Sequence, residues 1–242
     1  KVIFLCASAI ASTSILMQSR SDRFPNGLGN DSDQLGRNIM DHHLGVGAQG
    51  KYDGFDDKYY KGRKPNGIYI PRFQNLGGES DTKDFIRGYG YQGGASRGRP
   101  WSADGIGVEL KEQLLEPGNW SFGAGSWGEH LPYYENKVTL NRDKKDKWGL
   151  PTMDIDCEFK ENEMAMRKDM LASAVEMMEK AGLKNVQSYD NAPAPGFCIH
   201  EMGTARMGRD PKMSVLNAHN QVHAVPNVYV TDGACMTSSS CQ

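Results

Sequence analysis

Residues 120–127 read Trp-Ser-Phe-Gly-Ala-Gly-Ser-Trp, and this stretch decides the fold of the middle of the chain. Large and small side chains alternate along it with a period of two, which is the repeat of a β-strand with one buried face. Its glycines are typical of a strand that bends or that another backbone approaches closely. We therefore expect residues 120–127 to form a strand of a strongly curved sheet.

Similar short segments lie on the N-terminal side of this stretch, at residues 67–70 and 84–91, and clusters of Gly, Asn and Pro separate them. Short alternating segments with turn residues between them are typical of antiparallel sheets. The pattern therefore predicts a glycine-rich antiparallel sheet within residues 44–159.

On the C-terminal side, residues 135–140 and 152–159 alternate on either side of the charged run 142–147, which predicts a hairpin with a solvated tip. Residues 161–181 then place apolar side chains at helical spacing, and Gly182 follows as a helix C-cap. We expect this helix to cover one face of the sheet, with its methionines filling the core.

The N-terminal residues 1–19 begin with a lysine and an apolar run, a composition that superficially resembles a signal peptide. A buried strand over residues 2–5 and a helix over 11–19, with Ile15 and Leu16 facing the core, explain the pattern better. Because the first residue is not methionine, we expect the chain to begin inside a larger protein, at a strand-turn-helix unit of an α/β domain.

Composition excludes several classes of protein. The 242 residues are 38% hydrophobic, and 28 basic against 30 acidic residues give a formal net charge of −2. So small and mixed a charge predicts no nucleic-acid partner. No apolar stretch of about 20 residues occurs, so no membrane span is expected. The 5 cysteines form no CxxC pair, so we expect no metal site and no disulfide framework.

The C-terminal part of the chain carries the pattern that suggests chemistry. His200 opens the stretch His-Glu-Met-Gly-Thr-Ala-Arg-Met-Gly, and an apolar strand further on ends in Asp232-Gly233. Neutral imidazole is the side chain suited to accept a proton near neutral pH. A lone histidine is more often structural, so the motif around His200 carries its assignment as a base.

Four segments, in their order along the chain, resemble the glucose-methanol-choline (GMC) oxidoreductases. They are Gly36-Arg37-Asn38-Ile39-Met40-Asp41-His42, Glu135-x-Asn-x-Val138-x-Leu140, the His-x-x-Gly-Thr-x-x-Met-Gly stretch from His200, and Val230-Thr231-Asp232-Gly233. The resemblance implies an FAD enzyme that oxidises an alcohol by hydride transfer to the flavin while a histidine removes the hydroxyl proton. His200 matches that catalytic histidine.

The resemblance also implies cofactor-binding residues. Asp232, Gly233 and Ala234 match the segment whose backbone amides meet the flavin chain and its phosphates. Gly203 would let the backbone approach the flavin, and Thr204 would hold the turn, although both residues equally suit plain turn chemistry.

The same resemblance divides the chain into three parts: residues 1–43 and 196–242 as strips of an incomplete α/β FAD-binding domain, and residues 44–195 as a substrate-binding domain. The predicted fold class is α+β, a curved antiparallel sheet with a covering helix plus those strips. The fingerprint Gly-x-Gly-x-x-Gly of dinucleotide-binding domains does not occur. The family's second catalytic residue, a histidine or asparagine, would lie just past residues 237–242, so we expect this chain alone neither to hold FAD tightly nor to turn over.

Aromatic residues of the sheet suggest the substrate class, since flat rings pack on the apolar faces of sugars. On the substrate side we expect Trp127, Glu129 and His130. Aromatic strands also simply form cores. Family members with a tail like residues 238–242 tend to act on sugars or glycosides, so a sugar, polyol or glycoside hydroxyl is the leading hypothesis. The aromatic residues on which this substrate argument rests are Tyr89, Tyr91, Trp101, Trp120 and Trp127.

Alternatives stay open. The chain can instead be a non-catalytic carbohydrate-binding or structural module, which would not need the His200 segment. A cholesterol- or choline-type relative would have a more apolar or cation-caging pocket. His42 and His43 are expected to be structural. An electron-acceptor partner or small subunit is compatible with the resemblance, and both a cytoplasmic and a periplasmic location stay open.

Overall fold

The computed structural model describes residues 1–57, 67–82 and 84–239. Residues 240–242, the end of the tail on which the sugar preference rests, lie outside this part of the chain. The chain folds into two compact units. Of the described residues, unit 1 contains Lys1–His43, Glu129–Glu163 and 193–239, and unit 2 contains those of Leu44–Gly128 and Met164–Ala192.

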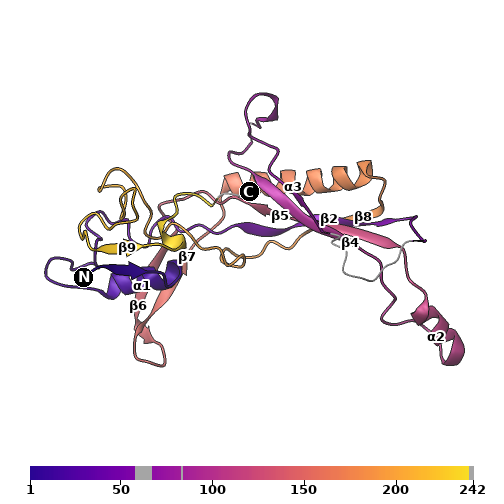
Figure 1. The fold of residues 1–242 in the computed structure, drawn as a ribbon, viewed down its shortest axis with the longest axis horizontal. Helices are drawn as coiled ribbons and strands as arrows, with labels where there is room; N and C mark the ends of the chain where they lie inside the picture. The colour runs from indigo at the N-terminus through magenta and orange to yellow at the C-terminus, as the bar shows by residue number, and fades with distance from the viewer. Residues whose placement is uncertain (58–66, 83, 240–242) are drawn as a thin grey trace. The chain divides into compact units, whose positions relative to one another are not determined.

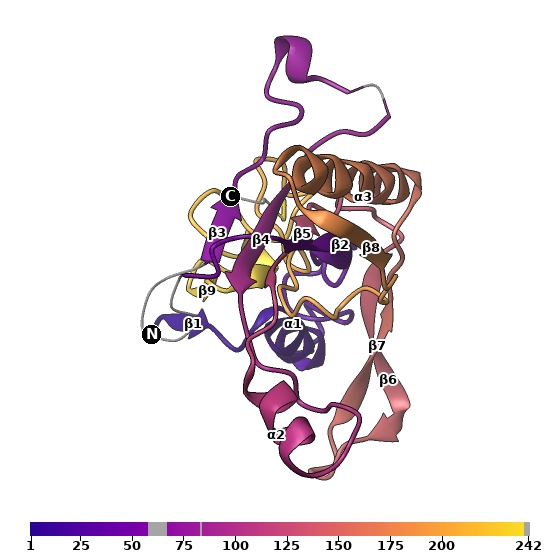
Figure 2. The ribbon, with the colours of Figure 1, turned by 90° about the vertical axis from the view of Figure 1, so that its right-hand side faces the viewer.

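Unit 2 is built on a five-stranded sheet with a long helix, α3 (Glu161–Lys180), beside it (Figures 1 and 2). The strands pair antiparallel from β3 to β5 and again between β2 and β8, which confirms the predicted type of sheet. Gly182, which follows helix α3, has a φ of 84°. This left-handed conformation confirms the prediction that Gly182 is the C-cap of the helix. In spatial order the strands are β3 (Gly67–Ile70), β4 (Tyr89–Ser96), β5 (Trp120–Gly128), β2 (His43–Tyr52) and β8 (Lys184–Asp190).

Glycines let backbones in this sheet lie unusually close. A Cβ added to Gly93 of β4 would lie 2.3 Å from the carbonyl oxygen of Gly123, and one added to Gly47 of β2 would lie 2.2 Å from that of Ala124. Neither approach is possible for a larger residue. The glycine-rich pattern thus reflects close approach of backbone to backbone.

The core of unit 2 is filled by methionines of α3. Met166, Met170 and Met178 are at most 2% exposed and belong to one cluster with the fully buried Tyr89 and Tyr91. The Tyr91 hydroxyl donates to the carbonyl oxygen of Met170 at 2.6 Å, so its burial leaves no polar group unsatisfied. The prediction that the helix methionines at helical spacing are core residues is confirmed for Met170 and Met178. It is wrong for Met164, which is 47% exposed.

Unit 1 contains a short parallel pair of strands and a hairpin (Figure 1). β1 (Ile3–Leu5) pairs with β9 (Val228–Val230), and the predicted order of strand, turn and helix is confirmed by α1 (Ala9–Gln18). The expectation that the strand is buried is wrong, since Ile3 and Phe4 are 48% and 62% exposed. The predicted hairpin is confirmed as β6 (Lys137–Lys145) and β7 (Pro151–Asp156). Together these elements supply the scaffold on which the candidate site lies.

One expectation about α1 is wrong. Leu16 is 1% exposed, whereas Ile15 is 42% exposed and does not face the core. Successive residues of an α-helix point about 100° apart, so a narrow buried stripe accommodates only one of the two neighbours.

The alternation pattern did not indicate helix α2 (Gly107–Leu115), which has no buried residue. Its apolar side chains include Val108 and Leu115, which are 69% and 55% exposed. A helix without a buried stripe leaves little periodic signal in the sequence. None of the helices described combines the length and the apolarity needed to cross a bilayer.

The compact units group residues 129–163 with the N- and C-terminal segments, whereas the predicted parts place them in the substrate domain. The contacts explain this grouping. Val138 donates its amide to the carbonyl oxygen of Gly36 at 2.7 Å, and His130 donates its amide to Oγ of Ser239 at 2.9 Å. The predicted boundary after residue 43 coincides with a unit boundary, and the functional division itself stays a prediction.

We expect Gly93→Ala to lower the free energy of unfolding by about 1–3 kcal/mol or more, because the added methyl overlaps the Gly123 carbonyl. Gly98→Ala is the matched control, since nothing lies within 4 Å of its added Cβ. Urea unfolding of the intact protein measures both. Equal midpoints for the two variants would contradict the close approach of β4 and β5.

Candidate active site

The candidate site in unit 1 is organised by the carboxylate of Asp41, which is 2% exposed. Its Oδ1 accepts the backbone amides of His42 at 2.8 Å and His200 at 3.0 Å. Its Oδ2 accepts those of Gly196 and Cys198, both at 3.0 Å. Four amide donors compensate for burying the charge. One side chain therefore ties the loop that leads into His200 to the residue just before β2.

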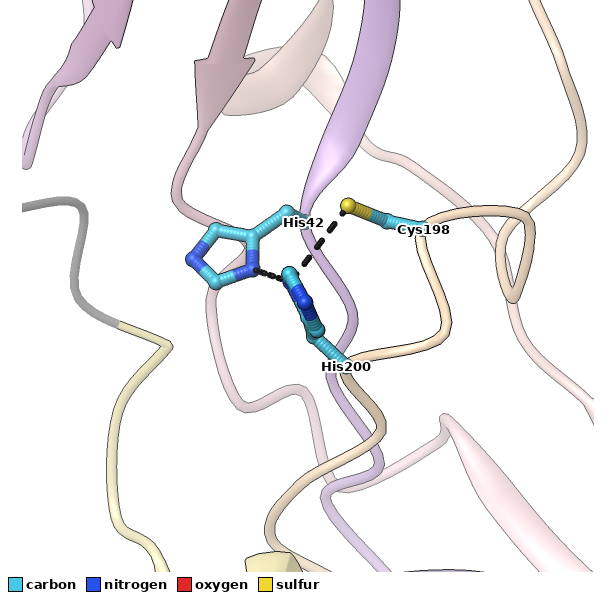
Figure 3. A group of neighbouring side chains, drawn as sticks. All are labelled: His42, Cys198 and His200. Carbon is cyan, nitrogen blue, oxygen red and sulfur yellow. Dashed lines mark hydrogen bonds between the residues drawn. The ribbon is translucent and has the colours of Figure 1, made fainter. Parts of the chain in front are cut away.

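The His200 side chain lies beside His42 and Cys198 (Figure 3). Its Nδ1 is 3.2 Å from Nδ1 of His42 and 3.5 Å from Sγ of Cys198. The two imidazole rings meet edge to face, with an interplanar angle of 87°. His200 is exposed, His42 is half-buried and Cys198 is buried. The imidazole of His200 is thus accessible although its backbone is held.

The backbone between Cys198 and His200 turns at Ile199, which has a φ of 58°. This left-handed conformation is rare for a β-branched residue and costs about 1–3 kcal/mol. The turn places Cys198 and His200, two residues apart, with their side chains in contact. The four hydrogen bonds to Asp41 hold the segment in this conformation.

A ladder of backbone hydrogen bonds joins the His200 motif to the Asp232 segment. Gly203 donates to the carbonyl oxygen of Gly233 at 3.1 Å, and Ala205 donates to that of Ala234 at 2.9 Å. The next rung runs from Met207 to Cys235 at 3.0 Å. The two segments, distant in sequence, therefore form one backbone platform.

Gly203 and Gly233 are required by close contacts inside unit 1. Gly203 has a φ of 89°, and a Cβ added to it would lie 2.3 Å from the carbonyl oxygen of Asn38. A Cβ on Gly233 would lie 2.4 Å from the carbonyl oxygen of Glu201. These contacts explain both glycines as packing residues. The approach of Gly203 and Gly233 to a flavin stays a prediction.

Thr204 and Asp232 both bind to the start of α1. The fully buried Thr204 hydroxyl accepts from Oγ1 of Thr13 at 2.7 Å and donates to the carbonyl oxygen of Ala9 at 3.2 Å. Asp232 accepts from the Ser12 hydroxyl through Oδ2. These bonds fix the motif segments to the helix that follows β1.

The carboxyl ends of β1 and β9, which are parallel, lead into α1 and into the short helix η2 (Gly233–Cys235). Ligands of α/β domains bind at the carboxyl ends of parallel strands, where glycine and open amides meet phosphates. The backbone at Asp232 and Gly233 suits such a ligand. The amide of Ala234 donates to Oδ1 of Asp232 at 3.0 Å, so it would reach a phosphate only by exchanging this partner.

Of the predicted substrate residues, His130 is 1% exposed and Glu129 is 2% exposed. Nδ1 of His130 accepts the backbone amide of Asp41 at 3.3 Å, and its Nε2 lies 3.1 Å from the Glu158 carbonyl oxygen. Burial lowers the pKa of His130, which favours the neutral ring. His130 thus supports the Asp41 segment from inside unit 1, and its contact with a substrate stays a prediction.

The aromatic residues divide into two groups. Tyr89 and Tyr91 are fully buried in unit 2. The prediction that their rings stack against a sugar is therefore wrong. Trp127 is half-buried on β5, and Trp101 is fully exposed. Trp127 belongs to unit 2, whereas Glu129 and His130 belong to unit 1.

Sequence reasoning missed the roles of Asp41, His42 and Cys198. Asp41 stood inside a quoted motif without a function, and His42 was expected to be structural. Cys198 has no CxxC partner, and the sequence assigns it no role. The available signal was local: Cys198 and His200 are two residues apart directly before the Gly-Thr turn, and His42 directly follows an aspartate.

Comparisons with known proteins find relatives of this chain. Residues 132–242 match the sequence profile of a family described as GMC oxidoreductase. The chain is 31% identical over 254 residues to 2-methyl-1,2-propanediol dehydrogenase of Mycolicibacterium austroafricanum, an alignment that covers 98% of this chain and 44% of that protein. It is 26% identical over 243 residues to the fructose dehydrogenase large subunit of Gluconobacter japonicus, with 99% and 43% covered.

Among solved structures, the crystal structure of pyridoxine 4-oxidase from Mesorbium loti has a similar fold, with a TM-score of 0.53 and 18% sequence identity. That likeness covers 100% of this chain and 48% of the other. The chain thus spans less than half the length of the curated relatives named above. The profile match, the two whole-chain alignments and the shared fold agree, and the chain belongs to the GMC oxidoreductases.

Proposed function

We propose that this chain supplies the active-site histidine and the substrate side of an FAD-dependent oxidoreductase that oxidises a CH–OH group of a sugar, polyol or glycoside. The observation that carries the proposal is the His200 imidazole, which is exposed while a buried carboxylate fixes its backbone. A base needs this combination, because it must reach the substrate and yet be held in position.

His200 acts as the base in this proposal. A hydroxyl becomes a good hydride donor only as its proton leaves, and neutral imidazole accepts that proton. Nδ1 of His200 lies against His42 and Cys198, so Nε2 is the nitrogen that accepts the proton. Donation of the Nδ1 proton to His42 keeps Nε2 unprotonated, since the partner of one ring nitrogen sets the state of the other.

FAD, when bound, accepts the hydride. The residues that would hold it are the backbone of Asp232, Gly233 and Ala234 and the turn at Gly203 and Thr204. Support comes from their position at the carboxyl ends of β1 and β9 and from the hydrogen bonds that join the two segments into one platform. Asp232 and Thr204 in turn fix the platform to α1.

The substrate class is supported by the names of relatives. These are a 2-methyl-1,2-propanediol dehydrogenase, a fructose dehydrogenase large subunit and a paromamine 6'-oxidase of Streptomyces fradiae, which is 27% identical over 235 residues. Trp127, Glu129 and His130 are proposed for the substrate side. Because one relative is named as a large subunit, a small subunit or an electron-acceptor partner is part of the proposal. A carbohydrate-binding module without catalysis would not need an exposed imidazole on a fixed backbone.

In the intact protein that carries this chain, we expect His200→Ala to lower kcat for alcohol-dependent dye reduction by about 10²–10⁴-fold, the usual contribution of a general base. The flavin content should not change. His219→Ala is the matched control, because His219 is exposed on a turn away from the motif. Unchanged turnover of His200→Ala would exclude the role as base and favour the binding module.

Asp41→Asn should lower the free energy of unfolding by about 1–3 kcal/mol and reduce turnover, because an amide nitrogen would face two backbone donors in place of a carboxylate oxygen. Thermal unfolding and dye reduction by the intact protein measure the two effects. Asp22→Asn, which changes an exposed carboxylate of unit 1, should leave both unchanged. An Asp41→Asn protein with wild-type stability would show that the carboxylate does not hold this segment.

The 242-residue chain alone should not retain FAD through gel filtration. Val2, Ile3 and Phe4 along β1 are 61%, 48% and 62% exposed, so the strands that would meet the cofactor lack cover in this chain. The intact protein is the positive control. A flavin absorbance band that coelutes with the 242-residue chain would contradict this expectation.

A further inference from the structure

We infer that His42, Cys198 and His200 form a binding site for one divalent transition-metal ion, and that Zn²⁺ is the ion that fits it best. The potential ligand atoms of these three residues all lie within 4.8 Å of one another. Two imidazole nitrogens and one thiolate are a ligand set that zinc accepts readily. No aspartate or glutamate side chain is needed as a ligand.

The distances between the ligand atoms agree with tetrahedral coordination. Zinc binds imidazole nitrogen at about 2.0 Å and thiolate at about 2.3 Å, so its ligands lie about 3.3 Å apart for two nitrogens and about 3.6 Å apart for nitrogen and sulfur. The Nδ1 atoms of His42 and His200 are 3.2 Å apart, and Nδ1 of His200 is 3.5 Å from Sγ of Cys198. The third pair, a ring nitrogen of His42 and Sγ of Cys198, lies within 4.8 Å.

The backbone of all three ligands is already fixed. Asp41 accepts the amides of His42, Cys198 and His200 on its two carboxylate oxygens. A metal ion would therefore not have to order a flexible loop, which lowers the entropic cost of binding. Figure 3 shows the three side chains close together, with His200 bonded to both His42 and Cys198.

Access also suits a metal site with one open position. His200 is exposed and His42 is half-buried, so an ion can enter, whereas the buried Cys198 would anchor it from inside. Within the described part of the chain the group supplies three ligands, and a zinc site with three protein ligands takes water or another ligand in the fourth position.

Metal binding would switch off the base, a consequence that rests on the proposed function. A neutral imidazole that binds a metal through Nδ1 carries its proton on Nε2. Nε2 of His200 then cannot accept the hydroxyl proton. Zinc would thus inhibit by fixing the tautomer of His200, and removal of the ion by a chelator would restore activity.

The test uses the intact, chelator-treated protein and Zn²⁺ alone. Calorimetric titration should give one zinc ion per chain, and zinc X-ray absorption should show one sulfur and two nitrogen ligands from the protein. The absorption measurement needs no variant. Absence of binding, or a bound zinc without a sulfur ligand, would overturn the site.

Variants locate the ion. His42→Ala and Cys198→Ser should each weaken zinc binding by about tenfold or more. Even mutation of residues that only hydrogen-bond the ligands of a metal lowers its affinity by about that factor, and these two variants remove a ligand itself. Cys6→Ser and His219→Ala are the matched controls, because they remove an exposed thiol and an exposed imidazole elsewhere in unit 1, and they should bind zinc as the wild type does. Wild-type affinity in a His42→Ala and Cys198→Ser double variant with a native near-ultraviolet circular dichroism spectrum would overturn the inference.

Turnover separates this inference from the proposed function. Zinc that binds through one sulfur and two nitrogens without slowing turnover would leave the metal site standing and overturn His200 as the base. If His200→Ala loses turnover and the wild-type protein binds no zinc, His200 stands as the base and the metal site is overturned.

Discussion

The buried carboxylate of Asp41 is the interaction on which the candidate site depends. A buried charge is tolerated only when it is fully hydrogen-bonded, and here four backbone amides satisfy it. Those amides come from His42 and from the loop that leads into His200. The same bonds that compensate for burial therefore decide where the imidazole lies, and they keep the unusual backbone of Ile199 in place.

Glycine extends this arrangement to the rest of the platform. Gly203 lies against the Asn38 carbonyl, and Gly233 lies against that of Glu201, so the segment around Asp41, the His200 motif and the Asp232 segment approach as closely as backbones can. Side-chain bonds from Thr204 and Asp232 then fix the platform to α1.

Unit 2 follows a different physical rule. Its sheet is held by glycine-mediated contact between strands, and its core is made by methionines of α3, whose flexible side chains fill irregular space. Tyr89 and Tyr91 serve that core. The aromatic content of the strands is thus partly a packing requirement. Trp120, Phe122 and Trp127 of β5 are half-buried, and Trp127 is the ring proposed for the substrate side.

Local patterns in the sequence determined the antiparallel type of the middle sheet, the hairpin at β6 and β7, α3 with its Gly182 cap, and the strand-turn-helix of β1 and α1, because side-chain periodicity and turn residues act over a few positions. The four motif segments, in their order along the chain, indicated the family. Only the tertiary structure decided that Asp41 holds the loop, that His42 and Cys198 meet His200, and that residues 129–163 pack with the chain's two ends. Apart from the contact between Cys198 and His200, these contacts join residues more than a hundred positions apart, and no local pattern records which distant partner satisfies a buried polar group.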